Sequence, residues 1–136
     1  MSARTKARKR AIDILFEADL RGADPVATAA DRLVDDERPI QPYALTLIEG
    51  VAARRERIDE LVSTYADGWS LDRMPGVDRA IIRTAVYELL WADDVPDVVV
   101  IDEAVELAKM LSTDDSPKFV NGLLGRLMQV KPDLAI

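Results

Sequence analysis

The amino-acid sequence predicts an all-α protein in which two helical sub-bundles share one core. Apolar residues recur at helical spacings in successive segments, and glycines, prolines and charged runs separate these segments. The one run that favours a strand, residues 98–101, has no second strand to pair with, so we interpret it as the start of a helix. The segment 68–76 has glycine at both ends and a proline inside, and we expect it to divide residues 1–67 from residues 68–136, with Trp69 buried.

Each expected helix has a start or stop signal in the sequence. Gly22 is suited to end the first helix, and Asp24 with Pro25 is suited to begin the second. Residues 35–42 read as a loop because they combine two prolines with a run of charges. Residues 77–91 are apolar almost all round, which is typical of a central, buried helix. The expected helices span residues 3–21, 25–34, 43–66, 77–91, 98–111 and 117–130.

The last helix is predicted to have two different faces. Ser116 is expected to cap its N-terminus and Pro117 to occupy its first position. The inner stripe consists of Val120, Leu123, Leu124 and Leu127. Phe119 falls at the edge of that stripe beside Lys118, where an aromatic ring and a cation could hold an unstacked base. The alternative is that Phe119 simply covers the core.

Two glycines interrupt the same helix away from its apolar stripe. Gly122 and Gly125 each cost about 1 kcal/mol relative to alanine in a helix interior. Something is therefore expected to approach the helix closely at these positions.

The composition excludes several classes of function. The chain has 136 residues, no cysteine and no histidine, which removes thiol nucleophiles, disulfides, imidazole acid–base chemistry and the common zinc ligand sets. No glycine-rich phosphate loop or hydrolase motif is present, so we expect neither an enzyme nor a cofactor. No apolar run approaches the roughly 20 residues of a membrane span, and no secretory signal precedes the first helix, so we expect a cytoplasmic protein.

The charge is distributed unevenly along the chain. The net charge is −7, yet residues 1–10 hold five bases and no acid, which leaves 13 bases and 25 acids, or −12, in the remainder. The five bases are Arg4, Lys6, Arg8, Lys9 and Arg10. Such asymmetry indicates a localised site for an anion such as RNA, and the alternative is a solvated basic terminus. Five neutralised phosphates would give a salt slope of up to about −3.5 on single-stranded RNA.

The first helix carries a second apolar face. Phe16 points about 160° away from the centre of the main apolar stripe on a helical wheel, with Ile12 and Leu20 beside it. The main stripe consists of Ala7, Ala11, Ile14, Leu15 and Ala18. This face needs a partner, which is either a neighbouring helix, a second protein or another copy of the chain in a homodimer.

Three segments together resemble the NusB family of bacterial transcription antitermination factors. They are ARKRAIDILFEADLRG in the first helix, VDRAIIRTAVYELL followed by DVP in the centre, and IDEAVELAKMLSTDDSPKFVNGLLGRL near the end. The resemblance implies two three-helix sub-bundles without catalysis. It also implies binding of single-stranded boxA RNA together with NusE, a small-subunit ribosomal protein, in an antitermination complex on RNA polymerase.

The resemblance assigns roles to individual residues. RNA contacts are expected from Arg4, Lys6, Arg8, Lys9, Arg10, Asp115, Ser116, Lys118, Phe119 and Asn121. Contacts with NusE are expected from Ile12, Phe16, Leu20, Asp78, Arg79 and Arg83. The cations and Phe119 are expected to lie close together, so that one RNA strand contacts both. No metal site, membrane or small-molecule substrate is expected.

Two other classes of protein remain open at this point. A NusB-like domain of a ribosomal RNA methyltransferase is disfavoured, because residues 1–136 leave no room for a cofactor-binding domain. The second is a protein-interaction scaffold whose basic terminus meets an acidic partner. Such a scaffold, or a NusB-like RNA-binding protein, could act in ribosomal RNA processing rather than in antitermination.

Overall fold

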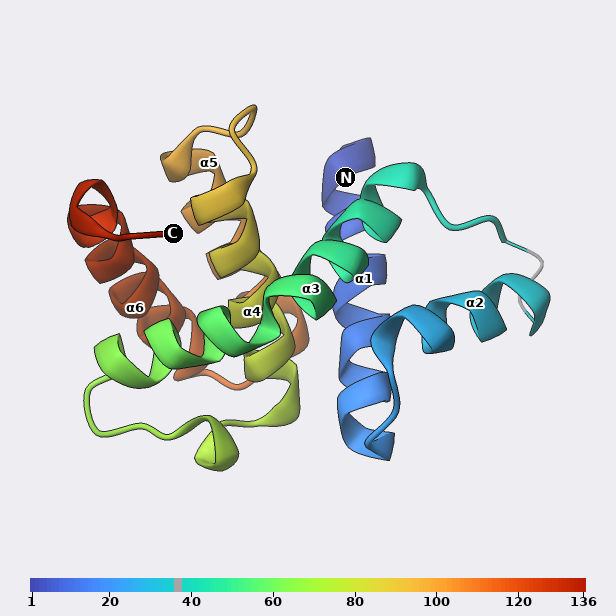
Figure 1. Cartoon of the computed structure of the whole chain (residues 1–136), viewed down its shortest axis with the longest axis horizontal. Coiled ribbons are helices and arrows are strands. Elements are labelled where there is room, and N and C mark those ends of the chain that lie inside the picture. Colours follow the sequence, from blue (N-terminus) through green and yellow to red (C-terminus); the bar gives the residue numbers. More distant parts are fainter. Residues whose placement is uncertain (36–37) are drawn as a thin grey trace.

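The fold is organised around helix α4, which packs against helices from both halves of the chain (Figure 1). The structure is a computed structural model that describes residues 1–35 and 38–136. It contains α1 (Ala3–Arg21), α2 (Pro25–Asp35), α3 (Pro42–Tyr65), α4 (Gly76–Trp91), α5 (Asp97–Leu111) and α6 (Ser116–Val130), with short 3₁₀ helices η1 (Leu71–Arg73) and η2 (Lys131–Asp133). No strand occurs among the described residues, and the predicted all-α fold is confirmed.

Helix α1 has the predicted limits, and α2 begins where the sequence predicts and ends one residue later. Gly22 ends α1 in the left-handed conformation, with φ of 63°, and its N–H bonds to carbonyl oxygens of the last turn. The carboxylate of Asp24 accepts a hydrogen bond of 2.9 Å from the backbone N–H of Ala27, so it caps α2. The predicted loop 35–42 is non-helical over 38–41, while Asp35 still belongs to α2 and positions 36 and 37 lie outside the described residues.

Helix α3 crosses from one half of the molecule to the other, which the helical pattern alone did not predict. Its backbone departs from helical geometry at Arg54, with φ of −115° and ψ of 16°, so the helix is kinked there. Beyond the kink it meets the C-terminal part of the chain. Arg57 donates to the carbonyl oxygen of Ala135 at 2.9 Å, and Arg126 of α6 donates to that of Tyr65 at 3.2 Å.

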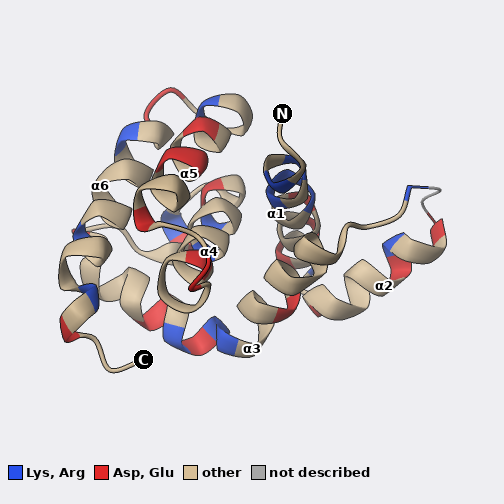
Figure 2. Cartoon of the chain, turned by 90° about the horizontal axis from the view of Figure 1, so that it is seen from above, with Lys and Arg blue, Asp and Glu red and all other residues tan. Residues whose placement is uncertain are grey.

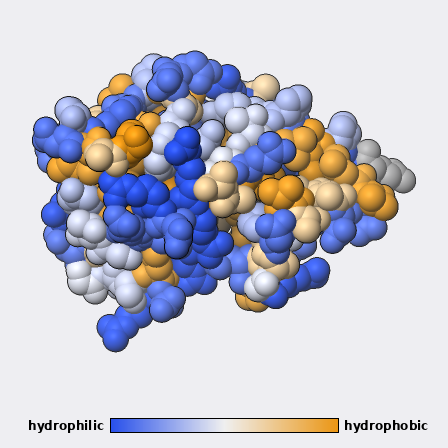
Figure 3. Space-filling view, in the orientation of Figure 1, coloured by the Kyte–Doolittle hydropathy of each residue, from blue (hydrophilic) through white to orange (hydrophobic). Residues whose placement is uncertain are grey.

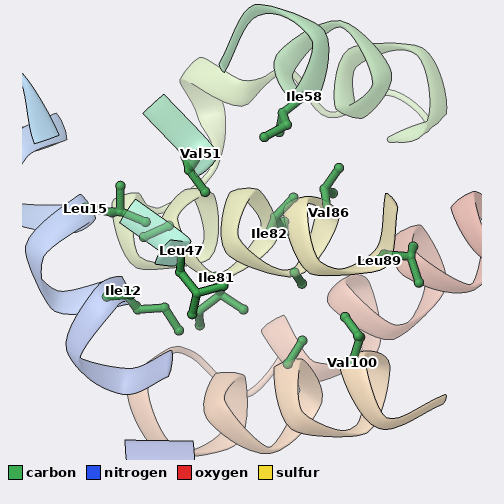
Figure 4. Packing of buried hydrophobic residues seen from close by; sticks show 14 of the residues in the cluster. Ile12, Leu15, Leu47, Val51, Ile58, Ile81, Ile82, Val86, Leu89 and Val100 are labelled. Carbon is green, nitrogen blue, oxygen red and sulfur yellow. The ribbon is translucent and has the colours of Figure 1, made fainter. Parts of the chain in front are cut away.

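The apolar core is continuous and is centred on α4 (Figure 4). Ile81 and Ile82 of α4 are 1% and 0% exposed, and they lie between α1, α3 and α5. The buried set includes Ile12 and Leu15 of α1. Both halves of the chain therefore contribute to one core, while the exact division at residues 67 and 68 stays a prediction.

The connection from α3 to α4 corrects one expectation. Trp69 is 53% exposed, although its hydrophobicity predicted burial. Its backbone N–H donates to the carbonyl oxygen of Ala66 at 2.7 Å, closing a turn in which Gly68 has a φ of 74°. A positive φ is readily adopted by glycine, which explains the residue at this position of the turn. The turn carries the indole outward rather than toward the core.

Glycine serves two different purposes in the helices. At Gly50 of α3, a Cβ atom would overlap the ring of Tyr87, so glycine allows α3 and α4 to approach closely. At Gly122 and Gly125 of α6, a Cβ atom would meet nothing within 4 Å. The close neighbour that the sequence led us to expect at these two positions is therefore not found among the described residues.

We expect Gly50→Ala to lower the free energy of unfolding by about 1–3 kcal/mol, because the added methyl group overpacks the α3–α4 contact. Urea denaturation followed by circular dichroism measures this change. The matched control is Gly125→Ala, which fills open space and is expected to be neutral or to stabilise by up to about 1 kcal/mol. Equal effects at the two positions would contradict the assigned contact.

Candidate nucleic-acid interface

The first turns of α1 hold a cluster of basic side chains (Figure 2). Arg4, Lys6 and Lys9 are exposed, and Arg10 is half-buried. Arg4 is partly engaged, because it forms an ion pair of 3.0 Å with Asp94 and lies 4.0 Å from the ring centre of Tyr43. The positive surface predicted for this tip is therefore present, and Lys6 and Lys9 are its most prominent members.

Arg8 does not belong to this surface. It is 4% exposed, and its guanidinium makes two hydrogen bonds of 2.7 and 2.9 Å with the carboxylate of Glu88 in α4. The same carboxylate accepts a bond of 2.6 Å from the hydroxyl of Tyr43, and Glu103 lies 3.3 Å from Arg8. We therefore correct the prediction that Arg8 contacts RNA, and assign it to a buried ion pair.

The pKa values of this buried group follow from its neighbours. Burial alone would lower the pKa of Arg8, but the hydrogen bond and charge of Glu88, with Glu103, outweigh it and raise the pKa above its usual value. Burial and the bond to Glu88 likewise raise the pKa of Tyr43. Arg8 therefore stays charged and the Tyr43 hydroxyl stays protonated at neutral pH.

A groove of about 800 Å³ runs beside the basic cluster along α1. Lys6, Lys9 and Arg10 line it, together with Phe16 further along the helix. Its lining also includes Val77 near the start of α4 and Leu111 at the end of α5. The groove thus joins a cationic part to an apolar part, and it extends toward the turn that precedes α6.

The start of α6 is organised by a buried carboxylate. The hydroxyls of Ser112 and Ser116 both donate to Asp78, which is 4% exposed, and the Ser116 bond is 2.9 Å. Ser116 is itself 2% exposed and lies inside the helix, and Asp115 takes the N-cap position without a side-chain bond. We therefore correct three predictions: Ser116 is neither the helix cap nor an RNA contact, and Asp78 is not a direct contact for NusE.

The outer surface of α6 retains the other predicted residues. Asp115, Lys118 and Asn121 are exposed. Phe119 is half-buried against the core, and its ring lies 5.7 Å from that of Trp69, at an angle of 55°. Sequence reasoning missed Trp69, because neither its hydrophobicity nor its spacing indicated that a turn would hold it outside.

The second apolar face of α1 is smaller than predicted. Ile12 is 3% exposed and belongs to the core. Phe16 is half-buried and contacts the backbone of Gly76, where a Cβ atom would lie 2.9 Å from its ring. Leu20 is 75% exposed. Apolar atoms are also exposed over the end of the molecule formed by α2 (Figure 3), where they belong to Val26, Leu33 and Val34.

Arg79 and Arg83 of α4 are engaged with carboxylates of other helices. Arg79 bonds to Asp19 of α1 at 2.9 Å, and Arg83 makes two bonds of 2.9 and 3.1 Å with Asp59 of α3. Burial alone would raise the pKa of Asp19, but the bond from Arg79, with Arg83 and Arg55 nearby, lowers it below the usual value. Arg83 is 6% exposed, so we correct its assignment as an exposed contact, whereas Arg79 keeps a partly exposed side chain.

The two predicted RNA-binding regions lie at opposite ends of α4. Arg8 contacts Glu88 and Ser116 contacts Asp78, ten positions apart on that helix. At 1.5 Å per residue this separation is about 15 Å. In Figure 1 the N-terminus lies at the top, and α6 begins near the bottom. The expectation that the cations and Phe119 are close neighbours is therefore wrong.

The described residues contain no group of three or more carboxylates that could hold a metal ion. Among the helices of residues 1–35 and 38–136, none combines the length and apolar character needed to cross a membrane.

These features define a small all-α protein in which two sets of helices share one central helix. The sequence model of the NusB family matches residues 5–129. A transcription antitermination protein NusB of Saccharopolyspora erythraea is 61% identical over 129 residues, which cover 93% of this chain and 87% of that protein. The chain belongs to the NusB family. The relative from Saccharopolyspora erythraea is named as a transcription antitermination protein, and the chain, as a member of this family, is not an enzyme.

Two solved structures have the same fold. NusB of T. maritima is 35% identical, with a TM-score of 0.83, and the match covers 98% of this chain and 99% of that one. A crystal structure of the antitermination factors NusB and NusE in complex with dsRNA contains a chain that is 27% identical, with a TM-score of 0.82. That match covers 93% of this chain and 96% of the other.

We expect Arg8→Ala to lower the free energy of unfolding by about 3–5 kcal/mol, because it leaves the carboxylate of Glu88 buried without its cation. The matched control is Lys9→Ala, which removes an exposed cation and should leave stability within about 0.5 kcal/mol. Denaturant unfolding separates the two variants. The corrected role of Arg8 would be refuted if Arg8→Ala were as stable as Lys9→Ala and had lost RNA affinity.

Proposed function

We propose that this chain is an RNA-binding transcription antitermination factor that recognises single-stranded boxA leader RNA together with NusE. The complex would assemble on RNA polymerase in the cytoplasm. Membership of the NusB family supports this proposal, as does the solved NusB–NusE complex with dsRNA. The observation that carries it is that Lys6, Lys9 and Arg10 line one groove of a chain whose net charge is −7.

Phosphate binding in this groove follows from the charge distribution. An acidic surface repels an RNA strand nearly everywhere, so the attractive region sets where the strand enters. Arg4, Lys6, Lys9 and Arg10 would meet the phosphates, and the groove would guide the strand toward α6. There Asp115, Lys118, Phe119 and Asn121 would contact bases, because a ring stacks on them and polar groups bond to their edges.

The NusE contact would use the end of α1. Phe16 and Leu20 are the two predicted contact residues that combine an apolar side chain with exposure. Arg79 would border this contact, while Ile12, Asp78 and Arg83 would support it from inside. A homodimer through the same face would compete with NusE.

RNA binding is expected to weaken as the salt concentration rises. With Arg8 buried, four cations remain, and the slope of log affinity against log salt is expected to reach about −2.8 at most. The double variant Lys6→Gln/Lys9→Gln should reduce the magnitude of that slope by about 1.4. Fluorescence anisotropy with boxA RNA and a scrambled RNA at several salt concentrations measures both the slope and the sequence preference.

The control for the salt experiment is Lys109→Gln, which removes an exposed cation of α5 that pairs with Glu106. Its slope should equal that of the wild type. Equal binding of boxA and scrambled RNA would argue against sequence recognition, and no binding of either would leave a protein-interaction scaffold as the better description.

Leu20 is the most exposed residue of the proposed NusE contact. Leu20→Asp should weaken NusE binding at least tenfold, because a charge would be buried in an apolar contact, while the 75% exposure of Leu20 leaves the fold intact. Isothermal titration calorimetry gives the affinity. Val98→Asp on α5 is the control, since Val98 is 62% exposed on a different helix. Unchanged NusE affinity of Leu20→Asp would move the contact elsewhere.

A further inference from the structure

We propose that Trp69 and Phe119 together form an aromatic wedge that holds one base of a single-stranded RNA, and that Gly122 lets this nucleotide lie directly on α6. The inference rests on the proposed RNA-binding function and extends it to a residue in the connection between α3 and α4. Figure 1 shows that connection passing near the start of α6.

The exposure of Trp69 is costly unless something covers it. An indole is among the largest apolar surfaces a residue can bury, and Trp69 remains 53% exposed. The neighbouring Phe119 has its ring partly buried against the core. With centroids 5.7 Å apart and planes at 55°, the two rings form a tilted pair, so a base that stacks on one ring would meet the other at an angle.

The turn that carries Trp69 is anchored on both sides. The bond from Trp69 to Ala66 closes the turn, and Asp67 within it forms an ion pair with Arg126 of α6. Arg126 also bonds to the carbonyl oxygen of Tyr65 at 3.2 Å. The turn is therefore placed beside α6 before any ligand binds, and the contact with Phe119 positions the indole there, which lowers the entropy lost on binding.

Gly122 leaves one position on the outer surface of α6 without a side chain. Gly122 is one helical turn after Phe119, it is exposed, and a Cβ atom there would meet nothing within 4 Å. Glycine in a helix interior lowers stability, and no contact within the described chain requires it here. A partner that approaches the backbone of α6 accounts for it.

The size and polarity of the wedge favour a nucleotide over a protein. A stable protein interface buries about 800 Å² on each partner, far more than two rings and a glycine provide. Lys118 and Asn121 are exposed on the adjoining face of α6, where both side chains can bond to the edge of a base. Asp114 and Asp115 are also exposed nearby, and carboxylates accept bonds from base amino groups.

Tryptophan fluorescence tests the inference directly. The chain has two tryptophans, so Trp91→Phe leaves Trp69 as the sole reporter. A short single-stranded boxA RNA should quench its emission over the same concentration range in which anisotropy reports binding. In the full chain, Trp69→Ala should lower RNA affinity roughly 5- to 150-fold, and Trp69→Phe should recover most of it, because both effects come from stacking.

Two further variants separate stacking from general damage. Met110→Ala removes an apolar side chain that is 51% exposed on α5, and RNA affinity should not change. Gly122→Ala should raise the melting temperature and yet weaken RNA binding, a combination that a merely structural glycine would not give. Circular dichroism verifies that each variant is folded, and the Trp91→Phe quenching experiment needs no change at position 69.

Each outcome decides between the two proposals. If the wild type binds no RNA, the proposed function and this inference both fail. If RNA binds, but Trp69 is not quenched and Trp69→Ala has normal affinity, the wedge is refuted and the proposed function stands. Loss of NusE binding by Trp69→Ala with normal RNA affinity would assign Trp69 to a protein contact and would also overturn the inference.

Discussion

The buried ion pair between Arg8 and Glu88 constrains the rest of this structure. It joins α1 to α4, and the hydroxyl of Tyr43 brings α3 to the same carboxylate. Removing two charges from water costs several kcal/mol for each ion, so the pair is tolerated because its hydrogen bonds are nearly complete. Arg8 lies between the exposed cations in sequence. Because the pair holds Arg8 against α4, it also sets the orientation in which the basic first turns of α1 face solvent.

A second set of charges holds the other end of α1. Asp19 bonds to Arg79 of α4, and Arg83 of α4 bonds to Asp59 of α3, so the same three helices meet again. The groove beside α1 lies along a helix that is fixed near both ends. Such a groove is already formed before a ligand arrives, which favours recognition without a large rearrangement.

The sequence predicted the helices well and the site less well, for different physical reasons. Helix limits depend on local signals, and Gly22 and Asp24 act in the structure as those signals predict. Burial of a charged residue depends on what lies opposite, and nothing near Arg8 in sequence reveals Glu88, 80 positions away. The resemblance to the NusB family assigned a role to each residue from its place in the sequence alone. It therefore could not distinguish Lys9, which is exposed, from Arg8 and Ser116, which are buried.

Exposure of aromatic residues was equally hard to predict. Trp69 is hydrophobic, but the turn closed by its bond to Ala66 directs it outward. The ion pair between Asp67 and Arg126 joins residues far apart in sequence, so it depends on the three-dimensional fold. The distance between the cations and Phe119 is also a property of the fold. It follows from the antiparallel packing of α1 and α4, in which Arg8 lies beside Glu88 and Asp19 beside Arg79.

The kinked helix α3 has a consequence for how the molecule holds together. Its first part packs with α1, its last turns meet α6 and the C-terminal residues, and a single apolar cluster runs through both. Neither half can complete its interior without the other, so the chain is expected to melt in one cooperative transition. Cutting it in the middle would leave two fragments with open interiors instead of two autonomous modules.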